Sequence, residues 1–360
     1  MKCAIIGARG IPARYGGFET FAEKLSTCLV KRGHEVTVYC CRHQKNDRSP
    51  YFQGVKRVFI PAVHKKALEK MTYTLLSFIH AVFRGYDVVL LLGVTGVPFS
   101  FILRMTGMKT VVNIDGLEWK RKKWGITASS YLKLSEFLSA RLCDVVVTDS
   151  KAIQDYFRKK YNKENHYIPY GADIIAPSSP EALSRFGLEK KGYYLQVCRL
   201  EPENNAHIVI REFEKNKTAR KLVILGDAPF ESAYVKNLKE TADPRIVFLG
   251  AHYGSDYRLL QSHAFANIHA HEVGGTNPAL LEGMASGNCV IALDAPFNME
   301  VVEEAGLLFS SKEGSLNEKI DFLEEHPEIV SSYGQKAIDR IRRLYLWDPI
   351  ISKYEVILGR

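Results

Sequence analysis

The sequence predicts an α/β protein with two domains, each built on a parallel sheet. Its 360 residues exceed the roughly 250–300 at which a single core stops growing. Short β-branched runs alternate with longer amphipathic stretches, and this alternation restarts in the second half. We expect an N-terminal domain over residues 1–175, a C-terminal domain over 176–340, and a final helix over 341–360 that crosses back to the first domain.

The first half contains a series of strand candidates and one clear amphipathic helix. Residues Phe18 to Arg32 place apolar side chains on one helical face, and Gly33 follows where a helix would end. The predicted strands are Cys3–Ile6, Glu35–Cys41, Arg57–Ile60, Val88–Leu92, Thr110–Ile114 and Val145–Thr148.

The second half repeats the pattern after a connecting region. Ile174 to Lys191 contains two prolines and is the predicted linker. The last amphipathic stretch, Tyr333 to Leu358, is long for a terminal cap. The predicted strands are Tyr193–Cys198, Leu222–Leu225, Ile246–Leu249, Ala266–His269 and Cys289–Leu293.

Composition narrows the class of protein. With 46% hydrophobic and 25% charged residues the chain is globular, and no apolar run reaches the ~20 residues that cross a bilayer. The N-terminus enters a strand pattern directly, without the apolar region of a secretory signal, so we expect a cytoplasmic protein. Its seven cysteines form no C-x-x-C pair, and we expect buried free thiols.

The formal charge of +9 is partly local, in the cluster Lys120–Lys123. A basic balance suits nucleic acid, an acidic membrane surface or anionic small molecules, although a solvated charged face is the default interpretation. The sequence lacks the arginine–aromatic interleaving and zinc spacing of nucleic-acid modules, so we expect no nucleic-acid partner.

Three loops follow predicted strand ends, where open parallel sheets bind their ligands. After the first strand, Gly16 and Gly17 stand at the start of a helix, where free N–H groups can meet phosphate; a turn required by chain geometry alone is equally consistent. Arg199 follows the first strand of the second half, and its guanidinium suits diphosphate oxygens or an ion pair with Glu201 or Glu203.

The third loop runs from His269 to Gly287. Asn277 is the predicted N-cap of a helix whose first residue is Pro278, and the preceding glycine turn forms a second anion site. Glu282 lies about one turn into this helix, where a carboxylate suits ribose hydroxyls; a helix-dipole role worth ~0.5 kcal/mol is the alternative. A metal site at the two histidines is the weaker interpretation, because they alternate along a strand.

Five motifs along the chain together carry a family resemblance. They are Gly16-Gly17-Phe18-Glu19, Gly33-His34-Glu35-Val36, Tyr170-Gly171-Ala172-Asp173, Arg199-Leu200 and Asn277-Pro278-Ala279-Leu280-Leu281-Glu282. Their order resembles that in retaining glycosyltransferases of family 4, and the resemblance spans nearly the whole chain. More narrowly, the chain resembles the bacterial rhamnosyltransferase-type branch of that family in Gly7–Pro12 with Tyr15–Glu19, in Asp115–Arg121 and in Pro202–Asn205.

The resemblance implies a GT-B fold, with two Rossmann-like parallel-sheet domains facing each other across a cleft, the donor in the C-terminal domain and the acceptor in the N-terminal one. It implies that Arg199 holds the donor diphosphate and Glu282 the ribose. The donor sugar or phosphate would contact the backbone of Gly275, Thr276 and Asn277. From the other domain, Gly16 and Gly17 would approach the diphosphate.

Two positions depart from the family pattern. The family has two glutamates with seven residues between them, and the earlier position is Gly274 here, with Glu272 nearby but out of register. The family's diphosphate lysine is replaced by Asn204 or Asn205. The helix N-termini and Arg199 would then neutralise the anion, with Arg9 and Arg14 as candidate helpers.

The implied chemistry is a retaining, metal-independent transfer. Arg199 and the two helix N-termini would stabilise the developing diphosphate charge. The acceptor hydroxyl would attack from the face of the departing phosphate. Asp115, expected at a strand end, is the candidate to orient or deprotonate it, while an Asx turn before Gly116 explains this residue equally well; Glu118 is a weaker candidate.

We expect no separate cofactor, because the dTDP- or UDP-linked sugar is a substrate. The branch suggests L-rhamnose from dTDP-rhamnose, passed to a glycan or polyprenyl-diphosphate-linked acceptor in bacterial O-antigen or capsule synthesis. Lys120–Lys123 with Trp119 and Trp124 would meet the anionic inner face of the membrane. A sugar-nucleotide 2-epimerase and a non-catalytic sugar-nucleotide-binding protein are the alternatives.

Overall fold

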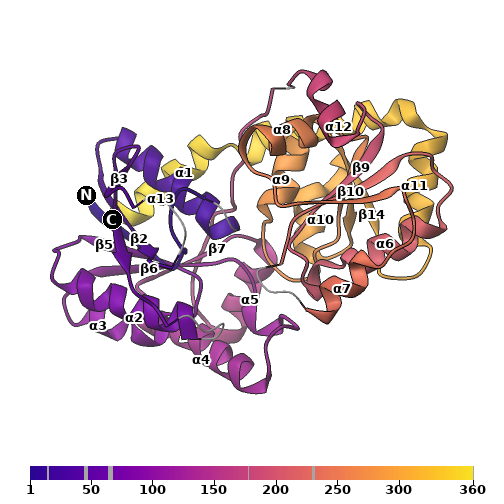
Figure 1. Ribbon diagram of the computed structural model, residues 1–360. Helices are drawn as coiled ribbons and strands as arrows, with labels where there is room; N and C mark the ends of the chain where they lie inside the picture. Colours follow the sequence, from indigo (N-terminus) through magenta and orange to yellow (C-terminus); the bar gives the residue numbers. More distant parts are fainter. Residues whose placement is uncertain (14–15, 44–47, 64–67, 177, 229–231, 360) are drawn as a thin grey trace. The chain divides into compact units, whose positions relative to one another are not determined.

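A computed structural model of the 360-residue chain shows two compact units (Figure 1). It describes residues 1–360 except 14–15, 44–47, 64–67, 177, 229–231 and 360. Unit 1 comprises Met1–Lys120, Trp124–Tyr170 and Trp347–Arg360, and unit 2 comprises Arg121–Lys123 and Gly171–Leu346.

Unit 1 is built on a sheet that has eight strands within the described residues, all parallel except the first pair. The predicted strands all form, within one or two residues of their expected bounds. Two additional strands of two residues each lie at the edges and are too short for any periodicity to reveal. In spatial order the strands are β3 (Tyr51–Phe52), β4 (Val55–Ile60), β2 (Glu35–Cys41), β1 (Lys2–Ile6), β5 (Val88–Leu92), β6 (Lys109–Ile114), β7 (Val145–Thr148) and β8 (His166–Tyr167).

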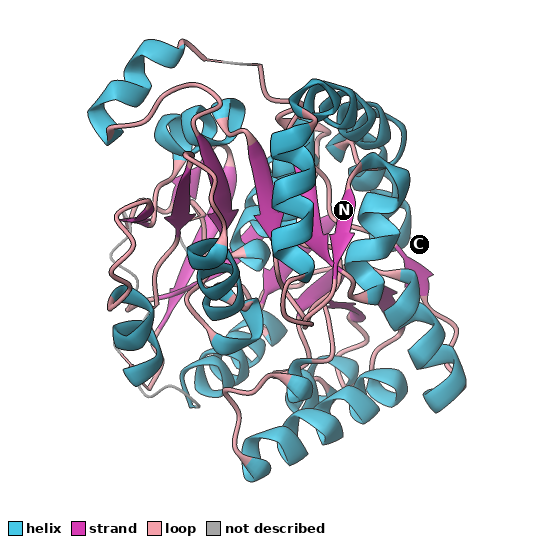
Figure 2. Ribbon diagram, turned by 90° about the vertical axis from the view of Figure 1, so that its right-hand side faces the viewer, coloured by secondary structure: helices cyan, strands magenta, loops and turns pink. Residues whose placement is uncertain are grey.

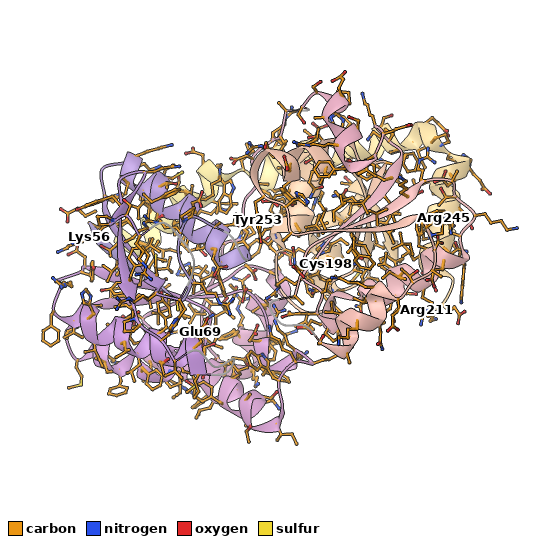
Figure 3. The ribbon with its side chains drawn as sticks, in the orientation of Figure 1. Lys56, Glu69, Cys198, Arg211, Arg245 and Tyr253 are labelled. Atoms are coloured by element: carbon orange, nitrogen blue, oxygen red, sulfur yellow. The ribbon has the colours of Figure 1, made fainter. Side chains whose placement is uncertain are left out.

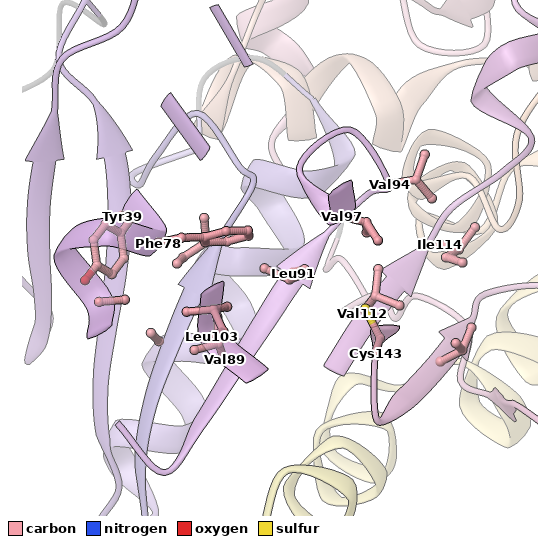
Figure 4. Packing of buried hydrophobic residues seen from close by; sticks show 14 of the residues in the cluster. Tyr39, Phe78, Val89, Leu91, Val94, Val97, Leu103, Val112, Ile114 and Cys143 are labelled. Carbon is pink, nitrogen blue, oxygen red and sulfur yellow. The ribbon is translucent and has the colours of Figure 1, made fainter. Parts of the chain in front are cut away.

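The helices of unit 1 cover both faces of this sheet, because a central parallel strand such as β5 is apolar and buried along its whole length. The core on one face packs Phe78 and Leu103 from two helices against strand residues such as Val89 and Leu91 (Figure 4). The helices are α1 (Gly17–Lys31), α2 (Leu68–Val82), α3 (Phe101–Arg104), α4 (Ile126–Leu142), α5 (Lys151–Tyr161) and α13 (Trp347–Gly359), with 3-10 turns η1 (Val97–Phe99) and η2 (Glu118–Lys120).

Unit 2 carries a fully parallel sheet of six strands within the described residues. The predicted strands of the second half form here, together with a three-residue edge strand that the sequence did not indicate. In spatial order they are β11 (Ile246–Gly250), β10 (Lys221–Leu225), β9 (Tyr193–Val197), β12 (Ala266–His269), β13 (Cys289–Leu293) and β14 (Leu307–Phe309).

The helices of unit 2 alternate with its strands along the chain, because each pair of parallel strands needs a crossover connection. They are α6 (Ala206–Lys215), α7 (Ala233–Lys239), α8 (Gly254–His263), α9 (Pro278–Ala285), α10 (Pro296–Val302), α11 (Ser315–Glu325) and α12 (Pro327–Leu344), with 3-10 segments η3 (Pro180–Phe186), η4 (Pro202–Asn204) and η5 (Glu303–Ala305). Helices are cyan and strands magenta in Figure 2.

Two expectations about connections need correction. The predicted linker is not a bare connection, because η3 buries Leu183 against the core under α8, and Leu188 follows it into the same cluster. Pro177 lies outside the described residues. The final stretch is not one helix: it breaks after Leu344, and a new helix begins at Trp347, which places Pro349 in a first turn where its missing N–H costs little.

Among the helices that the structure describes, none is long and apolar enough to span a bilayer. The seven cysteines are free thiols, and six of them are buried. Burial raises the pKa of Cys3, Cys143, Cys198 and Cys289 to about 12, so these thiols stay protonated and inert.

Candidate functional site

Unit 2 gathers charged side chains at the carboxyl edge of its sheet. Arg199 stands two residues beyond β9, next to the buried Cys198 (Figure 3), and its Nη2 lies 3.5 Å from Glu201 Oε2. The Asn204 side chain donates a hydrogen bond of 2.8 Å to the Arg199 carbonyl, which fixes the turn. The ion pair expected as the alternative role of Arg199 therefore exists, and it presents the guanidinium at the ligand-binding edge of the sheet.

A three-residue segment of the predicted basic cluster belongs to this edge. Lys122 Nζ lies 2.6 Å from Glu272 Oε1, and Lys123 Nζ lies 3.4 Å from Glu201 Oε1. Arg121 Nη1 lies 3.6 Å from Glu203 Oε1, and both of these side chains are almost or fully buried. The cluster is thus not a uniformly solvated basic face, because its charges are matched by carboxylates of unit 2.

The cations of this edge control the ionisation of Glu201. Burial alone would raise the pKa of Glu201, but Arg199, Lys123 and Arg121 together outweigh burial and lower it. Glu201 therefore remains a carboxylate and partly neutralises the surrounding positive charge. A diphosphate entering here would meet a balanced cluster whose cations are held in place by these carboxylates.

Two buried histidines lie at the end of the central strand β12: His269 is its last residue, and His271 lies two residues beyond it. The rings of His269 and His271 stack with centroids 4.3 Å apart and planes 13° from parallel. Burial lowers the pKa of His269 to about 3, and burial together with His269 and Arg199 lowers that of His271. Both rings are neutral at physiological pH, and the described residues give His271 Nδ1 no hydrogen-bond partner.

The glycine turn after β12 leads into α9 as predicted. The side chain of Asn277 caps the helix by accepting from the Ala279 amide at 3.0 Å, and Pro278 occupies the first helical position. Both features were predicted and are confirmed. Gly275 and Thr276 are buried just before the cap. The remaining first-turn amides and the helix dipole make this end of α9 suited to an anion.

Glu282 lies in the second turn of α9 and is held by a neighbouring helix. Its Oε2 accepts a hydrogen bond of 2.6 Å from the hydroxyl of Tyr257 on α8. Burial and the adjacent Glu282 raise the pKa of Tyr257 well above its usual value, so the phenol stays protonated and donates. Sequence reasoning missed Tyr257, because it belongs to no motif and precedes Glu282 by 25 residues.

Unit 1 has its own constellation at the carboxyl edge of its sheet. Gly7, directly after β1, has a positive φ of 113°, and a Cβ there would lie 2.4 Å from the Leu92 carbonyl oxygen. Gly16 is the N-cap of α1 and Gly17 its first residue, as expected. The buried Glu19 accepts from the Arg9 amide at 2.8 Å and so holds the loop onto the helix.

The charged groups around this loop come from several elements. Arg9 Nε lies 3.2 Å from Glu69 Oε1, where Glu69 is on α2 (Figure 3), so the candidate helper Arg9 is already ion-paired. The second candidate, Arg14, lies outside the described residues.

Asp115 follows β6 immediately, at the predicted strand end. Its neighbour Glu118 accepts from the Trp124 indole at 3.1 Å. A lysine that the sequence did not single out, Lys70, lies with its Nζ 4.9 Å from the centre of the Phe18 ring. Burial lowers the pKa of Lys70, and Glu118 and Asp115 oppose the shift, which shows that these groups share one electrostatic environment.

Two α/β units, each built on a largely parallel sheet, define a protein of the GT-B fold class. Residues 179–340 match the model of the glycosyl transferases group 1, and residues 1–173 match a domain of unknown function, DUF1972. The candidate residues divide between these regions. Asp115, Gly16 and Gly17 lie in the first, and the second holds Arg199, Gly275, Thr276, Asn277 and Glu282.

A curated relative is the O-antigen chain mannosyltransferase RfbU of Salmonella typhimurium, 24% identical over 210 residues. The match covers 57% of this chain and 58% of that protein.

Solved structures share the fold over nearly the whole chain. The sucrose-phosphate synthase of Thermosynechococcus elongatus superposes with a TM-score of 0.85 at 17% identity, covering 99% of this chain and 98% of that one. Anabaena Alr3699/HepE in complex with UDP-glucose gives 0.82 at 18% identity over 100% and 99%. WaaG, a glycosyltransferase involved in lipopolysaccharide biosynthesis, gives 0.78 at 16% identity over 99% of each chain.

Proposed function

We propose that this protein is a glycosyltransferase that moves a sugar from a nucleotide-diphosphate donor to a glycan or lipid-linked acceptor during surface polysaccharide assembly. One observation carries the proposal: unit 2 combines Arg199 beyond β9 with the capped N-terminus of α9 and Glu282 in its second turn. These groups suit a diphosphate and a ribose respectively. The match of residues 179–340 and the O-antigen mannosyltransferase relative support it.

In the proposed reaction, the oxygen of an acceptor hydroxyl bonds to the anomeric carbon of the donor while the bond from that carbon to the diphosphate oxygen breaks. The hydroxyl proton passes to the departing phosphate on the same face of the sugar, so the configuration is retained and neither a metal nor a cofactor takes part. Arg199 and the N-terminus of α9 stabilise the charge that develops on the diphosphate. Asp115 orients the acceptor hydroxyl.

The proposal also specifies the sugar and the nucleotide of the donor. We propose dTDP-L-rhamnose from the branch that the sequence resembles, with UDP-linked sugars as competitors because Alr3699/HepE was solved with UDP and UDP-glucose. The acceptor is proposed to be a glycan on a polyprenyl diphosphate.

A lipid-linked acceptor implies that the protein contacts a membrane. Arg121–Lys123 do not suit this contact, because carboxylates of unit 2 pair with them. We therefore place the membrane contact on a surface of unit 1, the α2–α4 face, where α2, α3 and the end of α4 lie next to one another (Figure 1). Phe83 and Met105 there are 81% and 82% exposed. Exposed apolar residues and basic ones on the same group of helices suit an anionic bilayer. The apolar residues are Ile79, Phe83, Phe101, Met105 and Phe137, and the basic ones Arg84, Arg104 and Arg141.

The test is binding and turnover across dTDP-rhamnose, UDP-glucose, UDP-N-acetylglucosamine and GDP-mannose, with Arg199→Ala and Glu282→Ala. Loss of one charge-assisted contact costs about 1.5–3 kcal/mol, so each variant should raise the donor KM roughly 10- to 100-fold. Glu313→Ala, on the exposed Lys215 ion pair, is the control and should change nothing.

Failure of every donor to bind would refute the proposal. Conversion of the donor to its 2-epimer without an acceptor would replace the transferase by an epimerase. Binding of a donor without any turnover in the presence of acceptors would leave a sugar-nucleotide-binding protein.

A further inference from the structure

Glu282 is the end of a chain of side-chain hydrogen bonds that crosses the interior of unit 2. The Tyr257 hydroxyl donates to Glu282 Oε2 at 2.6 Å, and Gln261 Nε2 donates to that hydroxyl at 2.9 Å. Asn267 Nδ2 donates in turn to Gln261 Oε1 at 2.6 Å. The chain therefore links α8, the centre of β12 and α9, and every bond in it points toward the carboxylate.

Gln261 and Asn267, which lie at the end of this hydrogen-bond chain away from Glu282, are held in place by burial. Gln261 and Asn288 are fully buried, Asn267 is 6% exposed, and the Asn288 side chain binds the Gln261 carbonyl at 2.6 Å. The residue after Glu282 is Gly283, and a Cβ there would lie 2.4 Å from Asn267 Nδ2. The absent side chain is what lets α9 lie this close to Asn267, so the helix and the chain hold each other in register.

The direction of the bonds determines what Tyr257 can do. Because its hydroxyl accepts from Gln261, its single proton is available for Glu282. A free glutamate side chain loses up to about 2 kcal/mol of rotamer entropy when a ligand orders it. A carboxylate already ordered by Tyr257 has lost that freedom before the ligand arrives, and this favours binding.

We infer that Tyr257, oriented by Gln261, is a positioning residue that presents the Glu282 carboxylate to the ribose hydroxyls of the nucleotide donor. The inference rests on the proposed function, since it assigns a ribose to Glu282. Tyr257 does not touch the donor. Its contribution is confined to the part of binding that depends on the ribose hydroxyls.

The experiment measures the affinity of dTDP, UDP, GDP and ADP and of their 2′,3′-dideoxy counterparts, which lack sugar hydroxyls, by calorimetry, for the wild type and Tyr257→Phe. The wild type prefers the hydroxyl-bearing form of the nucleotide it binds, and Tyr257→Phe reduces that preference about tenfold while its affinity for the dideoxy form is unchanged. Tyr193→Phe is the matched control. It removes another hydroxyl bond within unit 2, to the Leu260 carbonyl at 2.7 Å, and should keep the full preference.

Glu282→Gln completes the design. If Tyr257 acts through Glu282, adding Tyr257→Phe to Glu282→Gln produces no further loss of preference. The inference is overturned if the wild type prefers nucleotides with sugar hydroxyls and the folded Tyr257→Phe variant keeps this preference in full. The proposed function would still stand in that case. A wild type that binds none of the nucleoside diphosphates would overturn the proposed function, and the inference with it.

Discussion

Buried ionisable side chains at the edge of the unit 2 sheet are held in defined protonation states by their surroundings. Arg199 and Lys123 keep Glu201 charged, whereas burial keeps His269 and His271 neutral. The charged Glu201 favours a pre-ordered cationic edge. The neutral histidines lower the stability of the folded protein in acid, because a buried neutral histidine cannot take up the proton that the unfolded chain binds.

His269 should make unit 2 less stable in mild acid. Its folded pKa of about 3 lies below the 6.5 of an unfolded chain, so stability is present above pH 6.5 and is lost as the pH falls below it. Each such histidine contributes a slope of about 1.4 kcal/mol per pH unit. Between pH 7.5 and 5.5, the urea-unfolding free energy of the wild type should fall about 1 kcal/mol further than that of His269→Gln. His326→Gln, at a half-exposed site, should match the wild type, and an equal fall for His269→Gln would contradict this explanation.

At the scale of elements, helices of unit 1 leave large apolar side chains such as Phe83 and Met105 exposed. On the α2–α4 face, the Arg104 guanidinium binds the Arg141 carbonyl at 3.4 Å, and the Arg141 guanidinium lies 5.6 Å from the Phe137 ring. Arginines thus sit among the exposed apolar side chains rather than apart from them. The proposed membrane contact requires such a mixture, because apolar groups would insert into the bilayer and arginines would attract anionic headgroups.

We predict that Phe83→Ser with Met105→Ser weakens binding to phosphatidylglycerol-containing vesicles at least tenfold, since each large apolar side chain contributes about 1.5–3 kcal/mol when buried. Vesicle sedimentation measures this. The double variant Tyr253→Ser with Val356→Ser removes apolar residues that are 54% and 49% exposed elsewhere and should bind normally. Equal binding by all three proteins, or equal binding of the wild type to pure phosphatidylcholine at low salt, would exclude the α2–α4 face as an anionic-membrane surface.

At the scale of the whole molecule, the chain does not divide at a single point. The last helix, α13, belongs to unit 1 although more than 170 residues of unit 2 precede it. Its Glu355 binds Arg32 at 2.6 Å and His34 at 2.6 Å, and its Tyr354 packs on Phe21 with ring centroids 5.0 Å apart. Unit 1 is therefore complete only with α13 in place.

Tyr354→Ala should destabilise unit 1 selectively. The side chain is fully buried, and its hydroxyl receives a hydrogen bond of 2.5 Å from Asn113, so its removal should cost about 3–5 kcal/mol. Differential scanning calorimetry should show one of two transitions moving to lower temperature, with the other unchanged. Val356→Ala, on the half-exposed side of the same helix, should move neither. Equal shifts of both transitions would mean that the units unfold as one.

Much of the fold follows from local sequence. The longer strands of both sheets were predicted because buried parallel strands such as β5 and β13 are continuous apolar runs. The cap at Asn277 and the glycines at the start of α1 were predicted because helix ends are set by the few residues around them. Neighbouring residues are enough to determine these features.

Other features depend on contacts between distant parts of the chain, and only the tertiary structure decided them. Tyr257 meets Glu282 because β9 and β12 are adjacent in the sheet and bring α8 beside α9. Arg121–Lys123 pair with glutamates about 80 to 150 residues further along the chain. The sequence by itself determined which residues form strands, helix caps and glycine turns, since these are local free-energy choices. The partners of charged and polar side chains that lie far apart in the sequence, such as Glu282 and Arg121, were decided by strand order and helix packing, which no local pattern encodes.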